Sequence, residues 1–126
     1  MKRDMDLIRK MLFAVEENPH GFAPSELHVD GYSEEQVNYH AYLMVDAGLA
    51  TGFKLTSTTS TGPEMRITAL TWAGHDFLAA SRNETVWRKV TSRVTSLAGD
   101  VPFSLWNELL TYGLRRLFGD SLGMNL

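Results

Sequence analysis

The 126-residue sequence predicts an α+β fold that is mostly helical. A helix-forming stretch at 33–49 leads directly into a strand-forming stretch. Two strand-forming stretches then enclose a polar segment, and apolar residues recur at helical spacing before and after them. This order predicts a winged helix-turn-helix-like core with a β-hairpin wing over residues 1–82. Residues 83–126 are predicted to be a C-terminal helical extension that packs on the core, mediates dimerisation, or does both.

The first predicted helix runs from Asp4 to about Glu17. Its buried stripe has helical spacing. The stripe comprises Leu7, Ile8, Met11, Leu12 and Val15. Asp6, Arg9 and Lys10 are expected to face water. The helix should stop at 18–21, because Pro19 disfavours helical geometry in the residue before it.

Residues 21–32 occupy the place of the second helix of a helix-turn-helix. A proline and two glycines leave room for one helical turn at most. Leu27 and Val29 alternate with polar residues, which predicts a short strand. We expect this strand to pair beside the later hairpin, leaving a truncated second helix.

The central predicted helix spans 33–49. Ser33 and Gln36 match a capping box, and Gly48 suits a left-handed turn at its end. The inward stripe is expected to comprise Val37, His40, Ala41, Met44 and Ala47. The outward face is expected to comprise Glu35, Asn38, Tyr39, Tyr42 and Asp46.

Residues 49–56 and 65–71 are predicted to be the two strands of the wing, joined by a polar tip at 57–64. The tip offers hydroxyl groups, which can donate to phosphate. The cations Lys54 and Arg66 are set back from it.

Three helices should follow the wing. Thr71 can cap a helix over 72–81 that buries Trp72, Phe77 and Leu78. Asn83 can cap a second, to about residue 97. Its stripe comprises Val86, Val90, Val94 and Leu97, with Trp87 beside it.

The last predicted helix, 102–118, has nine large apolar residues, more than the one stripe a surface helix needs. Another chain or a membrane surface would have to cover the surplus. We favour a second copy, because only Arg115 and Arg116 supply the basic rim of an interfacial helix. The expected oligomer interface comprises Phe103, Trp106, Leu110, Leu114 and Leu117.

Charge argues against a polyanionic partner. The net charge is −3, and segments 1–32, 33–70 and 71–126 carry −2, −2 and +1. No Lys or Arg lies between Ser33 and Gly52, whereas DNA affinity comes largely from cations that displace counterions from phosphates. Without cysteines, a secretory signal or a long apolar run, the chain is expected to be cytoplasmic with no membrane span.

No pattern typical of catalysis is present, so no catalytic residue, metal or cofactor is predicted. His28 and Asp30 can share a metal but are expected to form a solvated edge. His40 is expected to donate to a backbone carbonyl in the core. His75 and Asp76 point about 100° apart on a helix and would not face one substrate atom.

Four segments resemble an uncharacterised prokaryotic and phage family catalogued as a domain of unknown function. They are MKRDMDLIR at 1–9, GYSEEQVNYH at 31–40, DAGL at 46–49 and LTWAGHDFL at 70–78, with Trp87 following. The resemblance implies a winged-helix-like core, often encoded by phages or mobile elements, and carries over no activity. The sequence departs from it at Ala41, where such helices bring a larger apolar residue, so something else must fill that space.

These observations predict a non-enzymatic winged-helix regulator or adaptor that binds another protein through the outward face of the central helix. It is expected to form a homodimer through its C-terminal helices. The alternative is a sequence-specific DNA-binding transcriptional regulator, with Asn38 and Tyr42 at base edges. Its phosphate contacts would be Lys54, Arg66, Arg82, Arg88, Lys89 and Arg93. The last four are otherwise expected to form a solvated face with a Glu84–Arg88 ion pair. A hydrolase that uses His28 and Asp30 is a third hypothesis, for which the sequence shows no supporting geometry.

Overall fold

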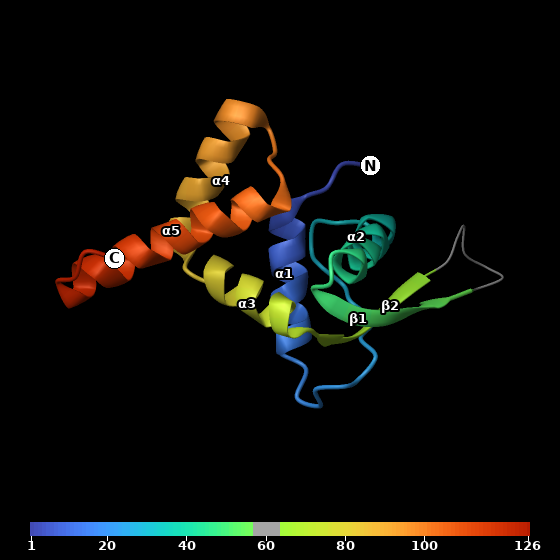
Figure 1. Cartoon of the computed structure of the whole chain (residues 1–126). Helices are drawn as coiled ribbons and strands as arrows, with labels where there is room; N and C mark the ends of the chain where they lie inside the picture. Colours follow the sequence, from blue (N-terminus) through green and yellow to red (C-terminus); the bar gives the residue numbers. More distant parts are fainter. Residues whose placement is uncertain (57–63) are drawn as a thin grey trace. The chain divides into compact units, whose positions relative to one another are not determined.

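Helices and one antiparallel hairpin make up the computed structural model, which describes residues 1–56 and 64–126 (Figure 1). The described elements are α1 (Met5–Glu16), α2 (Glu34–Asp46), β1 (Ala50–Leu55), β2 (Glu64–Leu70), α3 (Trp72–Ser81), α4 (Glu84–Ala98) and α5 (Phe103–Leu122). The predicted α+β, mostly helical class is confirmed. The chain forms two compact units, Met1–Leu78 and Ala79–Leu126. Their border falls within α3, slightly before the division predicted at residue 82.

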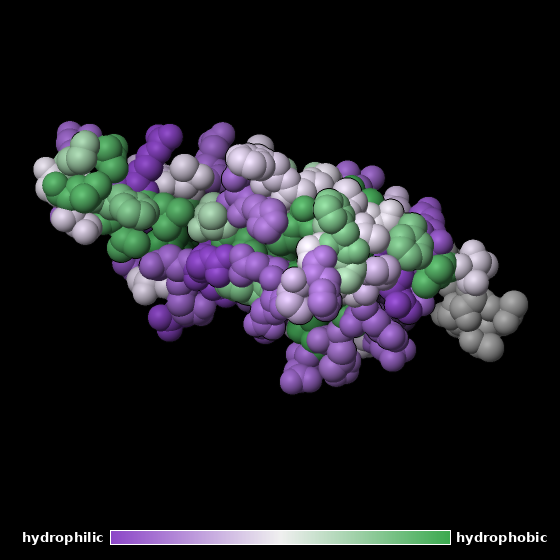
Figure 2. Space-filling model, turned by 90° about the horizontal axis from the view of Figure 1, so that it is seen from below, coloured by the Kyte–Doolittle hydropathy of each residue, from purple (hydrophilic) through white to green (hydrophobic). Residues whose placement is uncertain are grey.

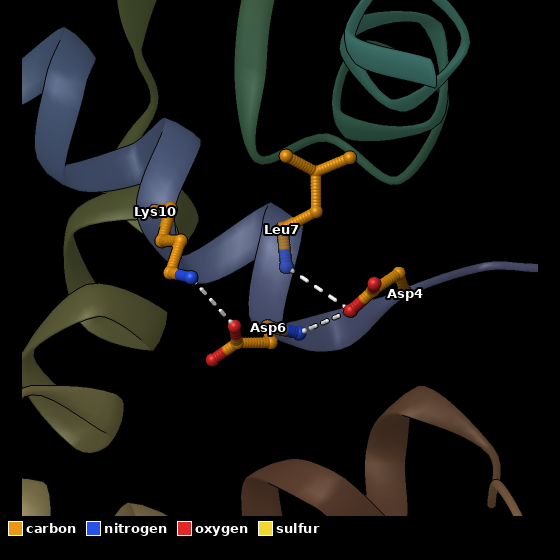
Figure 3. Close-up of polar contacts among 4 residues, drawn as sticks. All are labelled: Asp4, Asp6, Leu7 and Lys10. Atoms are coloured by element: carbon orange, nitrogen blue, oxygen red, sulfur yellow. Dashed lines mark hydrogen bonds and ion pairs between the residues drawn. The ribbon is translucent and has the colours of Figure 1, made fainter. Parts of the chain in front are cut away.

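Helix α1 begins at a side-chain cap. Asp4 Oδ1 accepts hydrogen bonds from the backbone N–H groups of Asp6, at 3.0 Å, and Leu7, at 3.2 Å (Figure 3). Lys10 Nζ lies 3.0 Å from Asp6 Oδ2 on the same helix. The whole predicted stripe is buried. Arg9, expected to face water, is only 8% exposed, because its guanidinium lies over the Phe13 ring, 5.1 Å from the centroid.

Helix α2 has the predicted capping box. Ser33 Oγ accepts from the Gln36 N–H at 3.1 Å, and the Gln36 side chain accepts from the Ser33 N–H at 2.8 Å. Gly48 follows the helix with a φ of +76°. The predicted inward residues are buried except Ala47, which is exposed with its neighbours as the chain leaves the last turn.

The hairpin forms within one residue of its predicted bounds. β1 and β2 pair antiparallel, with a register shift at Thr51 and Gly52, and pack against α2 (Figure 1). The predicted wing tip, 57–64, lies outside the described residues except for Glu64. A Cβ at Gly52 would overlap the carbonyl oxygen of Arg66, so glycine permits this close approach.

The prediction of a strand around Leu27 is wrong, although the segment does lie beside the hairpin, as predicted. Residues 18–32, all described, contain neither a helix nor an extended strand. Their backbone pairing with β2 is a bridge at Ser25 and Ile67, where the Ser25 N–H donates to the Ile67 carbonyl at 2.9 Å. Further along β2, the Met65 N–H is taken by the side chain of Asn38 instead of a strand partner, at 2.6 Å.

Helix α3 begins as predicted, but it does not bury its first residue. Thr71 Oγ1 accepts from the Gly74 N–H at 3.1 Å, and Phe77 and Leu78 are buried. Trp72 is 86% exposed, because residues five and six positions further along a helix fall on its opposite side.

The second unit contains α4 and α5, packed against each other. Asn83 caps α4 as predicted, accepting from the Val86 N–H at 3.0 Å. Trp87 and Trp106 stack with ring centroids 5.5 Å apart, and Trp106 Nε1 donates to Asp100 Oδ1 at 2.8 Å.

Three predictions for this unit need correction. Leu97 is 78% exposed instead of buried, because residues 95–100 are all exposed and the last turn of α4 lies beyond the packed part. Helix α5 continues past the predicted residue 118 to Leu122. Trp106 and Leu110, expected at an oligomer interface, are buried already within the single chain. None of the described helices meets the length and hydrophobicity that crossing a membrane requires.

Candidate functional site

Two tyrosines stand out on the solvent side of α2. Tyr39 and Tyr42 are 38% and 42% exposed, and their rings stack with centroids 6.4 Å apart and an interplanar angle of 23°. Successive helical side chains rotate by about 100°, so the exposed Glu35 and Asp46 fall on the same side. We call Glu35, Tyr39, Tyr42 and Asp46 the tyrosine face. It combines large apolar area with hydroxyl and carboxylate groups.

Lys54 borders this face from β1. Its Nζ lies 5.6 Å from the centroid of the Tyr42 ring, which is a cation–π distance. This wing cation is therefore engaged with an aromatic ring. In the DNA-binding alternative, this lysine would have to leave Tyr42 to reach a phosphate.

Asn38 does not belong to the tyrosine face, where it was predicted. Its Oδ1 accepts the Met65 N–H, so the side chain turns toward β2 and is only partly exposed. The helical spacing allowed either direction, because Asn38 lies at the border of the outward side. Only the register of the hairpin decides between them.

Arg66 is also engaged within the fold. Its side chain is 23% exposed, and Nη2 lies 3.9 Å from Glu26 Oε2 and 3.7 Å from Glu64 Oε1. The remaining predicted phosphate contacts lie in the second unit and are exposed: Arg82, Arg88, Lys89 and Arg93. Arg88 pairs with Glu84 at 3.9 Å, as predicted.

A groove of about 360 Å³ opens beside α2 and β2. Its lining combines apolar and charged side chains. Among them are Glu26, Leu27, Glu34, Ala41, Met65 and Arg66. The sequence predicted that another residue fills the space beside Ala41. Ala41 lines the groove but is only 3% exposed, so its neighbours cover most of it. The small side chain of Ala41 was the sequence feature that pointed to this place. The groove itself also depends on the path of residues 25–28 beside β2.

The histidines show no shared site. His40 is 2% exposed, and its Nδ1 donates to the Gln36 carbonyl at 2.8 Å. His28 Nε2 lies 3.5 Å from Asp30 Oδ1, with both side chains largely in solvent. His75 and Asp76 are exposed on α3. Within the described residues, no three His, Asp or Glu side chains are grouped to hold a metal.

Tyr32 lies against the start of α1. Burial, and then the charges and hydrogen bonding of the Asp4 and Asp6 carboxylates, raise the pKa of Tyr32 from 10.0 to about 12. Lys10 Nζ lies 5.6 Å from the centroid of the Tyr32 ring. These contacts tie the chain before α2 to the cap of α1 shown in Figure 3.

Residues 2–100 match the family described as "Hypothetical protein (DUF2513)". An uncharacterised protein of Haemophilus influenzae (strain ATCC 51907 / DSM 11121 / KW20 / Rd) is 33% identical over 109 residues, which cover 80% of this chain and 85% of that protein. No solved structure matches the chain. The family match ends before α5 begins.

Proposed function

The chain belongs to the DUF2513 family of hypothetical proteins, and we propose that it is a non-enzymatic, winged-helix-type module that binds another protein. The tyrosine face of α2 is the contact surface in this proposal. The module regulates or adapts the activity of its partner. A phage or mobile-element setting rests on the resemblance of its sequence motifs alone.

The order of elements supports a winged-helix-type core. α2 stands where such a fold places its third helix, and it leads within a few residues into the β1–β2 hairpin (Figure 1). α1, which precedes α2 in the chain, packs against both α2 and β2. The place of the second helix is taken by the irregular residues 18–32.

The observation that carries the proposal is the composition of the tyrosine face. Tyrosine is enriched at protein interfaces, because its ring buries apolar area while its hydroxyl keeps a polar partner. Here two stacked tyrosines lie between exposed carboxylates. A DNA-reading surface instead needs cations beside it, and residues 33–52 contain no Lys or Arg.

Sequence-specific DNA binding is the second candidate. The position of α2 in the element order favours it, as do the exposed Lys89 and Arg93 on α4. Against it, Lys54 faces Tyr42 and Arg66 faces two carboxylates. Asn38 was expected at a base edge, but its Oδ1 accepts a hydrogen bond from the Met65 N–H.

Homodimerisation through α5 is part of the proposal. Figure 2 shows hydrophobic surface at the C-terminal end of the chain, at the left of the view. The exposed large apolar residues of α5 are Leu105, Tyr112, Leu117, Phe118 and Leu122. Burying such a surface against a second copy removes it from water.

The test is an affinity capture with quantitative detection of the retained proteins. Wild type is compared with the double variant Tyr39→Ala/Tyr42→Ala, and Phe22→Ala is a control that removes a more exposed aromatic side chain elsewhere in the same unit. We expect the double variant to lose a specific partner that the Phe22→Ala control retains. A sequence-specific gel shift with a steep salt dependence would support the DNA alternative instead.

A further inference from the structure

The groove beside Ala41 lies where β2 loses its neighbour. Ser25 bridges Ile67, and residues two apart on a strand turn their backbone groups to the same edge. At Met65, that edge meets the Asn38 side chain instead of another strand. The groove lining includes both residues. The Met65 N–H and the Ile67 carbonyl are therefore already bonded within the chain, and the groove opens beside them.

The charges around the hollow are unequal. Three carboxylates line it, from Glu26, Glu34 and Glu64, against the single guanidinium of Arg66. Arg66 lies near two of these carboxylates, at 3.7 and 3.9 Å. Glu34 is exposed at the start of α2. A cationic side chain entering the groove would reduce this excess of negative charge.

Arg66 also presents an unmet donor. Its Nε is buried and has no hydrogen-bond partner within the described part of the chain. A buried donor without an acceptor carries a desolvation cost of roughly 1–3 kcal/mol. A carbonyl oxygen brought by a ligand would remove that cost.

The apolar part of the lining comes from Leu27, Val37, Ala41 and Met65. Ala41 carries only one side-chain carbon and is 3% exposed, so it contributes little to the groove surface. A volume of about 360 Å³ lies at the small end of ligand sites, which span roughly 300–1,000 Å³. It admits a few side chains, not a folded element.

We propose that this groove binds an extended peptide segment that carries a lysine or arginine beside an apolar residue. The peptide lies in the groove between α2 and β2, its cation faces Glu34 and Glu26, and a backbone carbonyl accepts from Arg66 Nε. In this kind of peptide recognition, side-chain pockets set the specificity. The site is separate from the tyrosine face, and the inference does not rest on the function proposed above.

The probe is a fluorescein-labelled octapeptide of alternating valine and lysine, capped at both ends. Fluorescence anisotropy measures its binding to the full-length protein. The comparison peptide has glutamate in place of each lysine. We expect saturable binding of the lysine peptide and at least tenfold weaker binding of the glutamate peptide. Equal affinity for the two peptides, or no binding of either, would overturn the inference.

Matched variants place the peptide in the groove. Glu34→Gln should weaken binding about threefold, whereas Glu35→Gln, the same change one position away on the tyrosine face, should leave it unchanged. Ala41→Leu should fill the hollow and weaken binding about tenfold or more. The double variant Tyr39→Ala/Tyr42→Ala should bind the peptide like wild type, which separates this site from the proposed function.

A spectroscopic readout covers the case in which Ala41→Leu does not fold. In NMR spectra of the wild type, the lysine peptide should shift the Arg66 Nε–H and Met65 amide resonances. Equal effects of the Glu34→Gln and Glu35→Gln changes, or shifts confined to other residues, would contradict the placement.

Discussion

His40 shows how one buried polar residue joins two elements that are distant in sequence. Its Nε2 accepts the Asp4 N–H at 2.9 Å, so Nδ1 carries the hydrogen that is donated to the Gln36 carbonyl. The sequence predicted that His40 donates to a backbone carbonyl, but not that the carbonyl is that of Gln36. It did not predict Asp4, because nothing local brings residues 36 positions apart together.

We expect His40→Ala to lower the free energy of unfolding by about 2–4 kcal/mol, through a cavity and an unpaired backbone N–H. Urea denaturation measures the change. The control is His28→Ala, which removes an exposed histidine and should shift stability by less than about 0.5 kcal/mol. Equal losses for the two variants would contradict the assigned role of His40.

Tyr32 makes stability depend on alkaline pH. Its pKa is raised in the fold, from 10.0 to about 12, so the folded state holds this proton more tightly than the unfolded state does. The stabilisation is fully present below about pH 10 and is lost as pH rises through about 12. In Tyr32→Phe, the free energy of unfolding should fall less steeply over this interval than in wild type. Parallel curves would contradict the prediction.

At the scale of elements, features set by neighbouring residues were predictable. The caps of α2, α3 and α4, the buried stripe of α1 and the strands of the hairpin follow from short-range spacing. Asn38 was misplaced, since its partner Met65 lies far away in the sequence. Trp72 was misplaced although helical spacing puts it opposite the buried Phe77 and Leu78. The groove could not be predicted from the sequence, because its lining comes from segments that are far apart along the chain.

Gly74 tests the close approach at the start of α3. A Cβ there would overlap the backbone carbonyl of Leu49, so Gly74→Ala should destabilise the protein by at least about 1 kcal/mol. Helix propensity alone predicts the opposite sign, because alanine is favoured over glycine by up to about 1 kcal/mol. Thermal unfolding distinguishes the two: a higher melting temperature for Gly74→Ala would show that the approach is not tight.

At the scale of the whole molecule, the chain joins a family-matched part to a helix outside that match. The family covers residues 2–100, whereas α5 spans Phe103–Leu122 and carries the largest group of exposed apolar residues near the C-terminus. Sequence composition alone indicated this surplus. It did not show that Trp106 and Leu110 are used internally, because that depends on how α4 and α5 pack.

We predict a dimer for the wild type in multi-angle light scattering. The double change Phe118→Lys/Leu122→Lys should convert it to a monomer with an unchanged melting temperature, because both side chains are exposed. Trp72→Lys, at an exposed aromatic on α3, should leave the dimer intact. A monomeric wild type, or dissociation by Trp72→Lys as well, would refute an α5 interface.

The central claim is that α2 presents its tyrosine face to a protein. Hydrogen–deuterium exchange on the complex with the captured partner tests this claim most directly. We predict that α2 peptides containing Tyr39 and Tyr42 exchange more slowly in the complex than in the free protein, while those of α4 are unchanged. Protection confined to α4 or α5, with α2 exchanging as in the free protein, would contradict the account.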